Sequence, residues 1–481
     1  MLGAMYDYDL VVIGSGPAGE KGAVQAAYFG KRVAVIERSP ALGGACVNTG
    51  TLPSKTLRET ALFLSGYRQR EMYGLQVKLT GTPSVPELMC RQEPVLGHEG
   101  GRIRVNLERH KVDLLEGSAR FVDEHTLEVT PEAGPPRRVS SDVVLIATGS
   151  TPHRPACVPF EDPEVDDSDS ILRLDRIPKA MVILGGGVIG CEYASIFAAL
   201  GTKCTIVEGR EQILGFLDGE VNALLTKQLR ALGCDLLLKK EVVDVGRTDG
   251  VLHCRLSDGT DLECERLLFA GGRAGNTRRI GLERINAAAD ARGLLKVDDK
   301  FRVAGVTGGR VYAAGDVIGF PALASVAMEQ GRVAACHAFG IEYKQKVASQ
   351  FPYGLYTIPE VSMIGETEES AKKKGIDFEV GRSRYGDNAR GQIVGDVHGM
   401  LKLVFDARDK KLLGVHVIGE RATELVHTGA AVMHFGGGID DFIEQVFNFP
   451  TLGEMFKYAA YDGLGRLRQR EEIIAERVQK L

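Results

Sequence analysis

Two glycine-rich segments of the chain have a spacing that suits the binding of a dinucleotide. In the first, an apolar run is followed by Gly14, Gly16 and Gly19, by a helical stretch, and by a second apolar run that ends at Glu37. The first glycine permits a tight turn, the second lets the backbone approach a pyrophosphate, and the third allows the helix to pack closely. Glu37 would accept hydrogen bonds from ribose hydroxyls.

The same order of elements recurs later in the chain. An apolar run at 181–184 precedes a helical stretch that extends to Leu200, and the run 203–207 leads into Glu208. The glycines of this second unit are Gly185, Gly187 and Gly190. A structural turn would explain one such motif, but two in the same context favour dinucleotide binding. Two sites imply two different dinucleotides.

The composition is that of an ordinary globular protein and argues against several partners. The 481 residues are 44% apolar and 26% charged, and they exceed what one hydrophobic core usually supports. A net charge of -5 gives no basic field for nucleic acid or an anionic membrane. No run of 18 apolar residues is present, and residues 1–9 carry acids rather than a signal-peptide pattern. We therefore expect a cytoplasmic protein without a nucleic-acid or membrane partner.

The nine cysteines form neither a metal-binding nor a disulfide pattern. They are scattered, with no Cys-x-x-Cys spacing and no nearby histidine ligand pattern. We therefore expect no metal site. Most of these cysteines, such as Cys191 and Cys204 inside apolar runs, are expected to be buried, inert thiols.

The segment from Gly43 to Lys55 resembles the active-site stretch of the flavoprotein disulfide reductases. Cys46 stands where the first redox cysteine would be, and Thr51 where the second would be. Thr51 cannot join a disulfide, so the resemblance implies electron entry from a nicotinamide through FAD without the usual thiol exit. We interpret Cys46 as a bystander, with a sulfenic-acid redox centre as the alternative. Thr51 could hydrogen-bond the flavin or water.

Two further segments resemble parts of the flavin domain of this family. The stretch 142–150, with Thr148 and Gly149, matches the strand that closes that domain. The stretch 310–316, with Gly315 and Asp316, matches its second flavin motif, in which the aspartate binds the ribityl chain. A helix-capping role is the alternative interpretation of Asp316.

After residue 346 the pattern resembles the C-terminal interface domain of the same family. Strands are predicted at 401–405 and 413–418, and helices at 423–434 and 440–446. The resemblance implies a homodimer, with a larger homo-oligomer as the alternative. Near its end the family carries a histidine before a proline, but here Phe449 precedes Pro450, and a phenyl ring cannot transfer a proton. Glu454 is then a surface carboxylate or a dimer-interface partner.

The fold class that the resemblance implies is α/β, with two Rossmann-like dinucleotide-binding domains and a C-terminal α+β dimerisation domain. The FAD domain would comprise residues 1–150 and 270–345, the NAD(P) domain residues 151–269, and the dimerisation domain residues 346–481. Gly272 would also bind a cofactor.

Lys55 and Glu192 are the predicted catalytic residues. Lys55 matches the family lysine near flavin N5, and Glu192 matches the ion-pair partner of that lysine. Either residue alone would more readily be a solvated charge, but the two matched motifs favour a buried pair.

Together, the two glycine units, Thr51, the segment 448–450 and the run 213–218 resemble the soluble, Si-specific NAD(P)+ transhydrogenases, class I pyridine nucleotide-disulfide oxidoreductases. The resemblance implies ping-pong hydride transfer between NADPH and NAD+ through flavin N5, with FAD, NAD and NADP bound. A disulfide-free NAD(P)H:quinone dehydrogenase of the same fold and a non-catalytic flavoprotein subunit are the alternatives.

The acid of the second unit bears on the choice between NAD and NADP. Glu208 can bond the 2′-hydroxyl of NAD but would repel the 2′-phosphate of NADP, and Arg210 is close enough in sequence to offset that repulsion. A solvent-exposed Arg210 without a function is the alternative. Dual specificity is therefore implied mainly by the resemblance.

Overall fold

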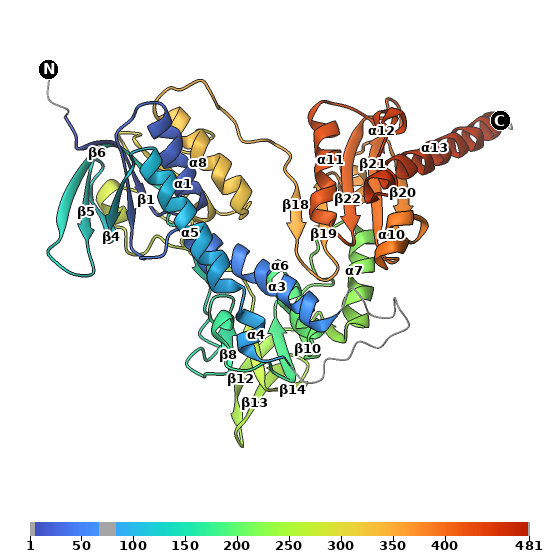
Figure 1. The fold of residues 1–481 in the computed structure, drawn as a ribbon, viewed down its shortest axis with the longest axis horizontal. Coiled ribbons are helices and arrows are strands. Elements are labelled where there is room, and N and C mark those ends of the chain that lie inside the picture. Colours follow the sequence, from blue (N-terminus) through green and yellow to red (C-terminus); the bar gives the residue numbers. More distant parts are fainter. Residues whose placement is uncertain (1–4, 67–82, 480–481) are drawn as a thin grey trace.

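The computed structural model describes residues 5–66 and 83–479, with side chains up to residue 473. Residues 1–4, where no signal peptide is predicted, lie outside the described residues, as do 67–82 of the predicted FAD domain and 480–481 of the predicted dimerisation domain. The described chain forms three lobes, each built on its own sheet (Figure 1). Among the described residues no helix has the length and apolar character needed to cross a membrane.

The first lobe contains a seven-stranded sheet in the order β3-β2-β1-β6-β5-β4, with β17 also paired to β6. Strand β6 links two kinds of pairing, because residues 141–146 run parallel to β1 and residues 137–140 run antiparallel to β5. Every residue of β2 is buried, as expected for a parallel strand covered on both faces. The strands are β1 (Tyr8–Ile13), β2 (Val33–Glu37), β3 (Asp113–Glu116), β4 (Ser118–Asp123), β5 (Thr126–Thr130), β6 (Arg137–Ile146) and β17 (Val311–Ala313).

The helices α1 (Pro17–Tyr28) and α8 (Ala324–Ala338) cover this sheet side by side, although they are far apart in sequence (Figure 1). Their contact requires a glycine, because a Cβ on Gly331 would lie 2.1 Å from the carbonyl oxygen of Ala18. Between β2 and β3 the chain also forms α2 (Gly44–Asn48), α3 (Thr51–Ser65), α4 (Val85–Met89) and α5 (Gln92–Arg109). Helices α3 and α4 reach the second lobe (Figure 1), because Leu57 of α3 and Leu88 of α4 belong to the core of that lobe.

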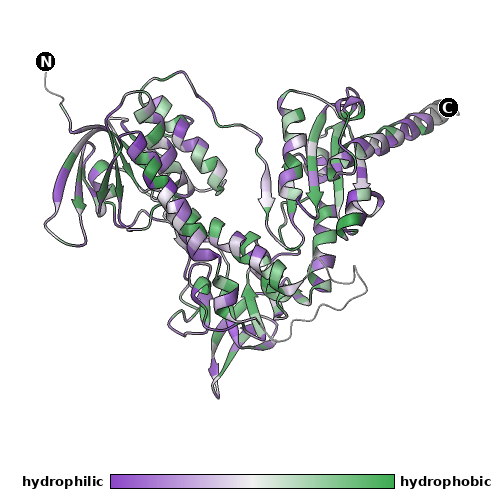
Figure 2. Cartoon of the chain, viewed as in Figure 1, coloured by the Kyte–Doolittle hydropathy of each residue, from purple (hydrophilic) through white to green (hydrophobic). Residues whose placement is uncertain are grey.

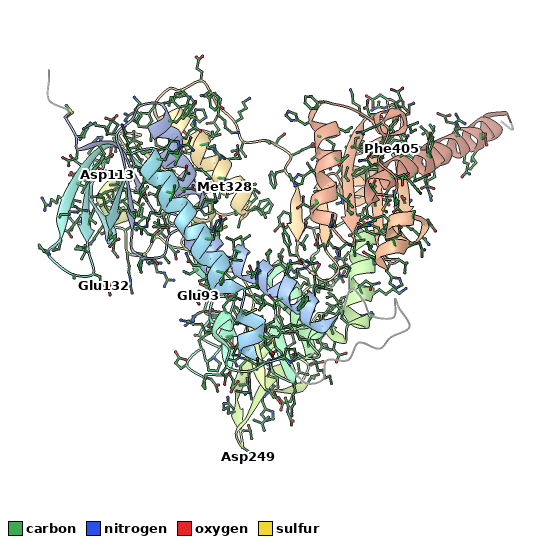
Figure 3. All side chains as sticks on the ribbon, viewed as in Figure 1. Glu93, Asp113, Glu132, Asp249, Met328 and Phe405 are labelled. Carbon is green, nitrogen blue, oxygen red and sulfur yellow. The ribbon has the colours of Figure 1, made fainter. Side chains whose placement is uncertain are left out.

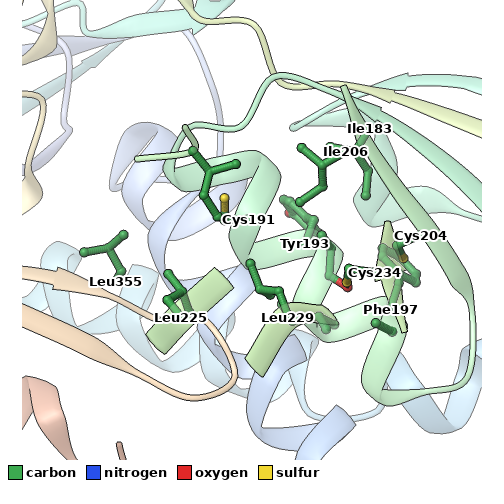
Figure 4. Packing of buried hydrophobic residues seen from close by; sticks show 14 of the residues in the cluster. Ile183, Cys191, Tyr193, Phe197, Cys204, Ile206, Leu225, Leu229, Cys234 and Leu355 are labelled. Atoms are coloured by element: carbon green, nitrogen blue, oxygen red, sulfur yellow. The ribbon is translucent and has the colours of Figure 1, made fainter. Parts of the chain in front are cut away.

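The second lobe is a parallel five-stranded sheet in the order β11-β10-β9-β15-β8, beside an antiparallel sheet of β12, β13 and β14. Figure 4 shows part of its core, where Ile183 and Ile206 of the sheet pack against Tyr193 and Phe197 of helix α6. The elements are β8 (Val165–Asp167), β9 (Ala180–Leu184), α6 (Val188–Ala199), β10 (Lys203–Glu208), α7 (Gly219–Ala231), β11 (Cys234–Leu238), β12 (Val242–Thr248), β13 (Val251–Leu256), β14 (Asp261–Cys264) and β15 (Arg266–Phe269).

The chain leaves the first lobe and returns to it through two paired strands. Strand β7 (Ser150–Pro152) runs antiparallel to β16 (Arg273–Gly275). The second lobe is therefore an insertion whose entry and exit are hydrogen-bonded to each other. Single helical turns lie at η2 (Ser170–Arg173), η3 (Leu282–Ile285) and η4 (Asp316–Ile318).

The third lobe is an antiparallel sheet in the order β18-β19-β22-β21-β20. The two predicted strands and two predicted helices of this region are present as β21, β22, α11 and α12. Phe405 of β21 is fully buried (Figure 3), and Figure 2 shows that the central strands are mainly hydrophobic, whereas α13 mixes both kinds of residue. The elements are β18 (Tyr353–Leu355), β19 (Val361–Gly365), α9 (Glu368–Lys373), β20 (Phe378–Arg384), η5 (Tyr385–Asp387), α10 (Ala389–Val394), β21 (Met400–Asp406), β22 (Leu412–Ile418), α11 (Ala422–His434), α12 (Ile439–Glu444), η6 (Leu452–Glu454) and α13 (Met455–Gln479).

Candidate nucleotide and active site

The first glycine turn joins β1 to α1 and leaves room for a phosphate. Gly14 has a φ of +105°, and a Cβ there would lie 2.5 Å from the carbonyl oxygen of Ala147. A Cβ on Gly19 would lie 1.9 Å from the carbonyl oxygen of Gly14, so both positions require glycine. On Gly16 the nearest atom to a Cβ is 4.0 Å away, so this position faces space into which a pyrophosphate fits.

The second glycine turn, between β9 and α6, repeats this geometry. Gly185 has a φ of +113°, and a Cβ on it would lie 2.8 Å from the carbonyl oxygen of Ala270. A Cβ on Gly190 would lie 1.9 Å from the carbonyl oxygen of Gly185, while no described atom lies within 4 Å of one on Gly187. Both predicted turns therefore have the shape that a dinucleotide phosphate needs at the start of a helix.

The acid of the first unit is hydrogen-bonded within its own lobe. Glu37 is buried at the end of β2, and its Oε2 accepts hydrogen bonds from the backbone N–H and the hydroxyl of Ser15, at 2.8 and 2.7 Å. The backbone N–H of Ser39 donates to Oε1 at 3.0 Å. Among the described residues no cation pairs with this carboxylate.

The acid of the second unit is paired with the predicted arginine. Arg210 donates from Nε to Oε1 and from Nη2 to Oε2 of Glu208, both at 3.0 Å, and the backbone N–H of Gly186 donates to Oε2 at 2.8 Å. Burial opposes the charge on Glu208, but these hydrogen bonds and the Arg210 charge hold its pKa below the usual value. The Arg210 side chain is 63% exposed, so this arginine is both exposed and paired.

Four predicted flavin-binding residues lie at the carboxyl ends of β6 and β17, beside the first glycine turn. Asp316 accepts a hydrogen bond from the Ser150 hydroxyl at 2.7 Å, and the backbone N–H of Gly315 donates to Gln330 at 2.8 Å. The Thr148 hydroxyl is buried and has no hydrogen-bond partner among the described residues. Buried polar groups normally have partners, so Thr148 fits a site that a bound molecule completes. Gly149, with a φ of +66°, turns the chain there.

Cys46 and Thr51 lie close together at the junction of α2 and α3. Burial raises the pKa of the Cys46 thiol, and a hydrogen bond from the Thr51 side chain opposes this only in part. Cys46 is therefore a neutral thiol near pH 7 and a poor nucleophile. All nine cysteines are free, and no group of three or more His, Cys, Asp or Glu side chains among the described residues is arranged to hold a metal ion.

Helices α3 and α6 bring the two predicted catalytic residues together. The Nζ of Lys55 lies 2.7 Å from Oε2 of Glu192, although the residues are 137 positions apart. The Glu192 side chain is 5% exposed and that of Lys55 is 24% exposed. A buried carboxylate of this kind requires a cation and further hydrogen bonds to be stable.

The third lobe supplies further contacts to this ion pair, and sequence reasoning did not assign them. The backbone N–H of Tyr356 donates to Oε1 of Glu192 at 2.9 Å, and the Tyr356 ring lies 4.8 Å from the Lys55 ammonium. The ammonium is thus held between a carboxylate and an aromatic face. Tyr356 belongs to the region after residue 346 that resembles the interface domain. It lies far from Lys55 in the sequence, so no sequence pattern indicates that the two residues are in contact.

Arg273 and Asp169 are also absent from the sequence prediction. Arg273 follows the predicted Gly272, and its guanidinium donates to the hydroxyl and the carbonyl of Ser150, both at 2.8 Å. Its Nη1 lies 3.5 Å from Asp169. Burial raises the pKa of Asp169, although the charge of Arg273 opposes this. The basic side chain next to Gly272 is the signal that points to this cluster.

Two dinucleotide turns, an inserted second lobe and a lysine–glutamate pair where the lobes meet define an oxidoreductase of the two-dinucleotide flavoprotein class. The chain belongs to the pyridine nucleotide-disulphide oxidoreductase family: the model of that family matches residues 8–331, and the model of its dimerisation domain matches residues 351–460. The predicted fold class and family are confirmed.

Curated relatives match the chain over nearly its whole length. A soluble pyridine nucleotide transhydrogenase from Mycobacterium bovis is 47% identical over 467 residues, which are 96% of this chain and 98% of that protein. One from Erwinia tasmaniensis is 40% identical and one from Pseudomonas aeruginosa 37%, each over 96% of this chain and 99% and 100% of their own lengths.

Solved structures share the same fold at lower identity. LpdA from Mycobacterium tuberculosis matches with a TM-score of 0.86 at 25% identity, over 94% of this chain and 99% of its own. The HOCl-induced flavoprotein disulfide reductase RclA from Escherichia coli matches with a TM-score of 0.84 at 27% identity, over 94% and 99%.

Proposed function

We propose that this protein transfers hydride between NADPH and NAD+ through bound FAD, without a redox-active disulfide. The observation that carries the proposal is the Lys55–Glu192 pair, held by Tyr356 next to a site that has one cysteine and a threonine. The similarity to curated transhydrogenases supports the same activity. FAD, when bound, would supply the centre that takes a hydride from one nicotinamide and gives it to another.

The side chains suit a reaction that consumes no proton. Exchange of a hydride between two nicotinamides leaves the proton count unchanged, whereas reduction of a disulfide requires proton transfer to the thiols. Thr51 and Phe449 stand where a second thiol and an imidazole would serve that purpose. Lys55, fixed by Glu192, would hold one positive charge beside the flavin and need not release its proton.

The proposed division of the chain follows the two turns. Residues 1–150 and 270–345 would bind FAD, using Glu37, Thr148 and Asp316 among others. Residues 151–269 would bind either nicotinamide nucleotide at the second turn, and the Glu208–Arg210 pair would accept a 2′-hydroxyl or a 2′-phosphate. The cytoplasmic location stays a prediction.

The test is a nucleotide-exchange assay on the purified flavoprotein. Mixing it with NADPH and thio-NAD+ should produce reduced thio-NAD, and initial rates should give the parallel-line pattern of a ping-pong reaction. An FAD-loaded protein that NADPH reduces but that leaves thio-NAD+ unchanged would rule out the proposal. Much faster turnover with quinones than with thio-NAD+ would instead assign a quinone reductase.

Two lysine variants test the site within that assay. Lys55→Met should lower the rate about a hundredfold, because the charge next to the flavin is lost and a buried Glu192 is left unpaired. Lys31→Met is a matched control, because Lys31 lies 4.8 Å from the ring of Phe339, the same distance as Lys55 from Tyr356. Equal exchange rates in the two variants would show that Lys55 has no role in the reaction.

We also propose a homodimer formed through the third lobe. This lobe matches the family's dimerisation domain and exposes large apolar side chains, with Phe435 86%, Val446 89% and Phe449 74% exposed. Sedimentation velocity should give twice the chain mass of 52.0 kDa for the native protein and a shift toward the monomer for Phe449→Glu. A native monomer at micromolar concentration would contradict this.

A further inference from the structure

A buried lysine of the third lobe holds the end of a segment that lies against the second glycine turn. We propose that Lys402 is a positioning residue for the nicotinamide nucleotide and acts through Asp218 and residues 213–218, called here the strap. This inference rests on the proposed nucleotide site at Gly185–Gly190. It assigns a function to the contact between the second and third lobes.

The Lys402 ammonium is enclosed by carboxylates from two lobes. Its side chain is 1% exposed, and its Nζ lies 2.8 Å from Oδ1 of Asp218, 2.6 Å from Oε1 of Glu368 and 3.2 Å from Oε2 of Glu220. Asp218 is 0% exposed. Three carboxylates match the three donors of an ammonium, and loss of the contact to Asp218 would leave that buried carboxylate without its cation.

Asp218 connects this cluster to α7 and to the strap. It is the N-cap of α7, where its Oδ1 accepts from the backbone N–H of Glu220 at 3.1 Å, and its Oδ2 accepts from that of Glu368 at 3.3 Å. One turn into α7, the Asn222 amide donates to the carbonyl oxygens of Ile213 and Leu214 at 2.7 and 3.3 Å. Both ends of the strap are therefore attached to the start of the same helix.

The other side of the strap lies on the second glycine turn. The backbone N–H of Leu214 donates to the carbonyl of Gly186 at 3.0 Å, and a Cβ on Gly186 would lie 2.7 Å from the Ile213 side chain. Gly186 is the residue whose own N–H donates to Glu208. A shift of the strap must therefore move the turn that would hold the phosphates and the acid that would hold the ribose.

The strap also contacts the third lobe close to the ion pair. The ring of Phe216 lies 5.1 Å from that of Tyr353, which is three residues before Tyr356. The strap thus spans from the glycine turn to the segment that contacts Lys55 and Glu192. Lys402 fixes one end of this span, so its expected effect is on nucleotide affinity rather than on flavin retention.

The experiment measures binding of NADP+ and of NAD+ to the FAD-loaded protein by calorimetric titration, together with the FAD content of each variant. Lys402→Met should weaken the binding of both nucleotides about tenfold, because the second glycine turn, once displaced, loses its aligned contacts to the nucleotide. FAD content should stay at the native value, and the KM values should rise more than kcat falls. Equal affinity in the variant and the native protein would overturn the proposal.

Two further variants separate positioning from general damage. Arg382→Met is the matched control, because Arg382 pairs with Glu220 and Glu368 at 2.7 and 3.3 Å but has no hydrogen bond or ion pair to Asp218. It should keep native affinity, and an equal loss there would overturn the proposal. The pair of changes Asp218→Asn and Lys402→Met leaves no unpaired charge at this contact and provides a test if the single variant does not fold.

The double variant Asp218→Asn, Lys402→Met should still bind both nucleotides weakly, because the strap has lost its ion pair to the third lobe. A return to native affinity would show that the Lys402–Asp218 contact is not needed and would overturn the proposal. The titration does not depend on turnover. A protein that binds both nucleotides and fails to exchange hydride would contradict the proposed function, while the effect of Lys402 could still be measured.

Discussion

The two glycine turns have nearly the same backbone but differ in what surrounds them. In each, the first glycine is left-handed, a Cβ on the last would lie 1.9 Å from the carbonyl oxygen of the first, and the middle one faces open space. The first turn is fixed within its own lobe, since the Ser15 hydroxyl binds Glu37 and accepts from the backbone N–H of Gly43. The second turn contacts residues 213–218, which the third lobe holds from outside.

This difference matches two kinds of occupant. A turn closed by its own lobe suits a dinucleotide that stays bound, and a lone carboxylate at Glu37 suits an unphosphorylated ribose. A turn held by a neighbouring lobe, with Glu208 balanced by Arg210, suits nucleotides that enter, react and leave. We therefore propose that contacts far away in the sequence give the same local motif different roles.

The largest expected effect comes from filling the open position in each turn. Gly16 and Gly187 have φ values of -64° and -81°, which valine adopts, and no described atom lies closer than 4.0 Å to a Cβ there. Valine should therefore leave the fold intact and weaken the phosphate contact by about 1–3 kcal/mol, or roughly five- to 160-fold. Gly16→Val should purify with little FAD, as measured by flavin absorbance per chain.

Gly187→Val is the counterpart in the second turn. It should retain FAD and lose binding of NADPH and of NAD+, as measured by titration. The comparison between the turns fails if Gly187→Val loses the flavin and keeps the nucleotides, or if both variants lose FAD equally.

The next effect sharpens the comparison between the two acids. Arg210→Ala leaves Glu208 buried without its cation, so the 2′-phosphate of NADP meets an unbalanced charge. Affinity for NADPH should fall about tenfold and affinity for NAD+ should change little, because hydrogen bonds to charged groups contribute about 1.5–3 kcal/mol. Competition titrations with both nucleotides measure this.

A control for the arginine lies in the first unit, where Arg38 follows Glu37. Arg38→Ala should leave both affinities unchanged. An equal loss of NADPH and NAD+ binding in Arg210→Ala would mean that the arginine supports the turn generally and does not discriminate between the nucleotides.

Sequence reasoning succeeded where the signal is local. The turns at Gly14 and Gly185 follow from glycine spacing, and the α/β order and the C-terminal strands follow from apolar periodicity. Pairing of Lys55 with Glu192 came from two matched motifs, since a separation of 137 positions carries no pattern of its own. Family resemblance, not composition, supplied the third lobe as an interface domain.

Contacts between lobes stayed hidden for the same physical reason. Tyr356 reaches Glu192 through a backbone N–H, which every non-proline residue has, so its identity reveals nothing. Lys402 lies in the apolar run of β21, where a lone lysine in the sequence looks like a solvated edge residue. The carboxylates of Asp218, Glu220 and Glu368, which come from two lobes, explain why that lysine is buried.

The smallest expected effect concerns Cys46, which lies in the helix next to the first glycine turn. The thiolate is the reactive form of cysteine, and burial raises the pKa of Cys46 above its ordinary value. The thiol is therefore protonated at neutral pH and should be alkylated slowly there, with a rate that rises as the pH approaches the raised pKa. Cys90 and Cys157 are exposed and act as internal controls that should react first. Peptide mass spectrometry after timed iodoacetamide treatment measures all three rates.

The Cys46→Ser variant should change the rate of hydride exchange by less than about twofold, because the site needs no second electron acceptor. Alkylation of Cys46 at pH 7 ahead of Cys90, or loss of exchange in the serine variant, would make this thiol part of the reaction.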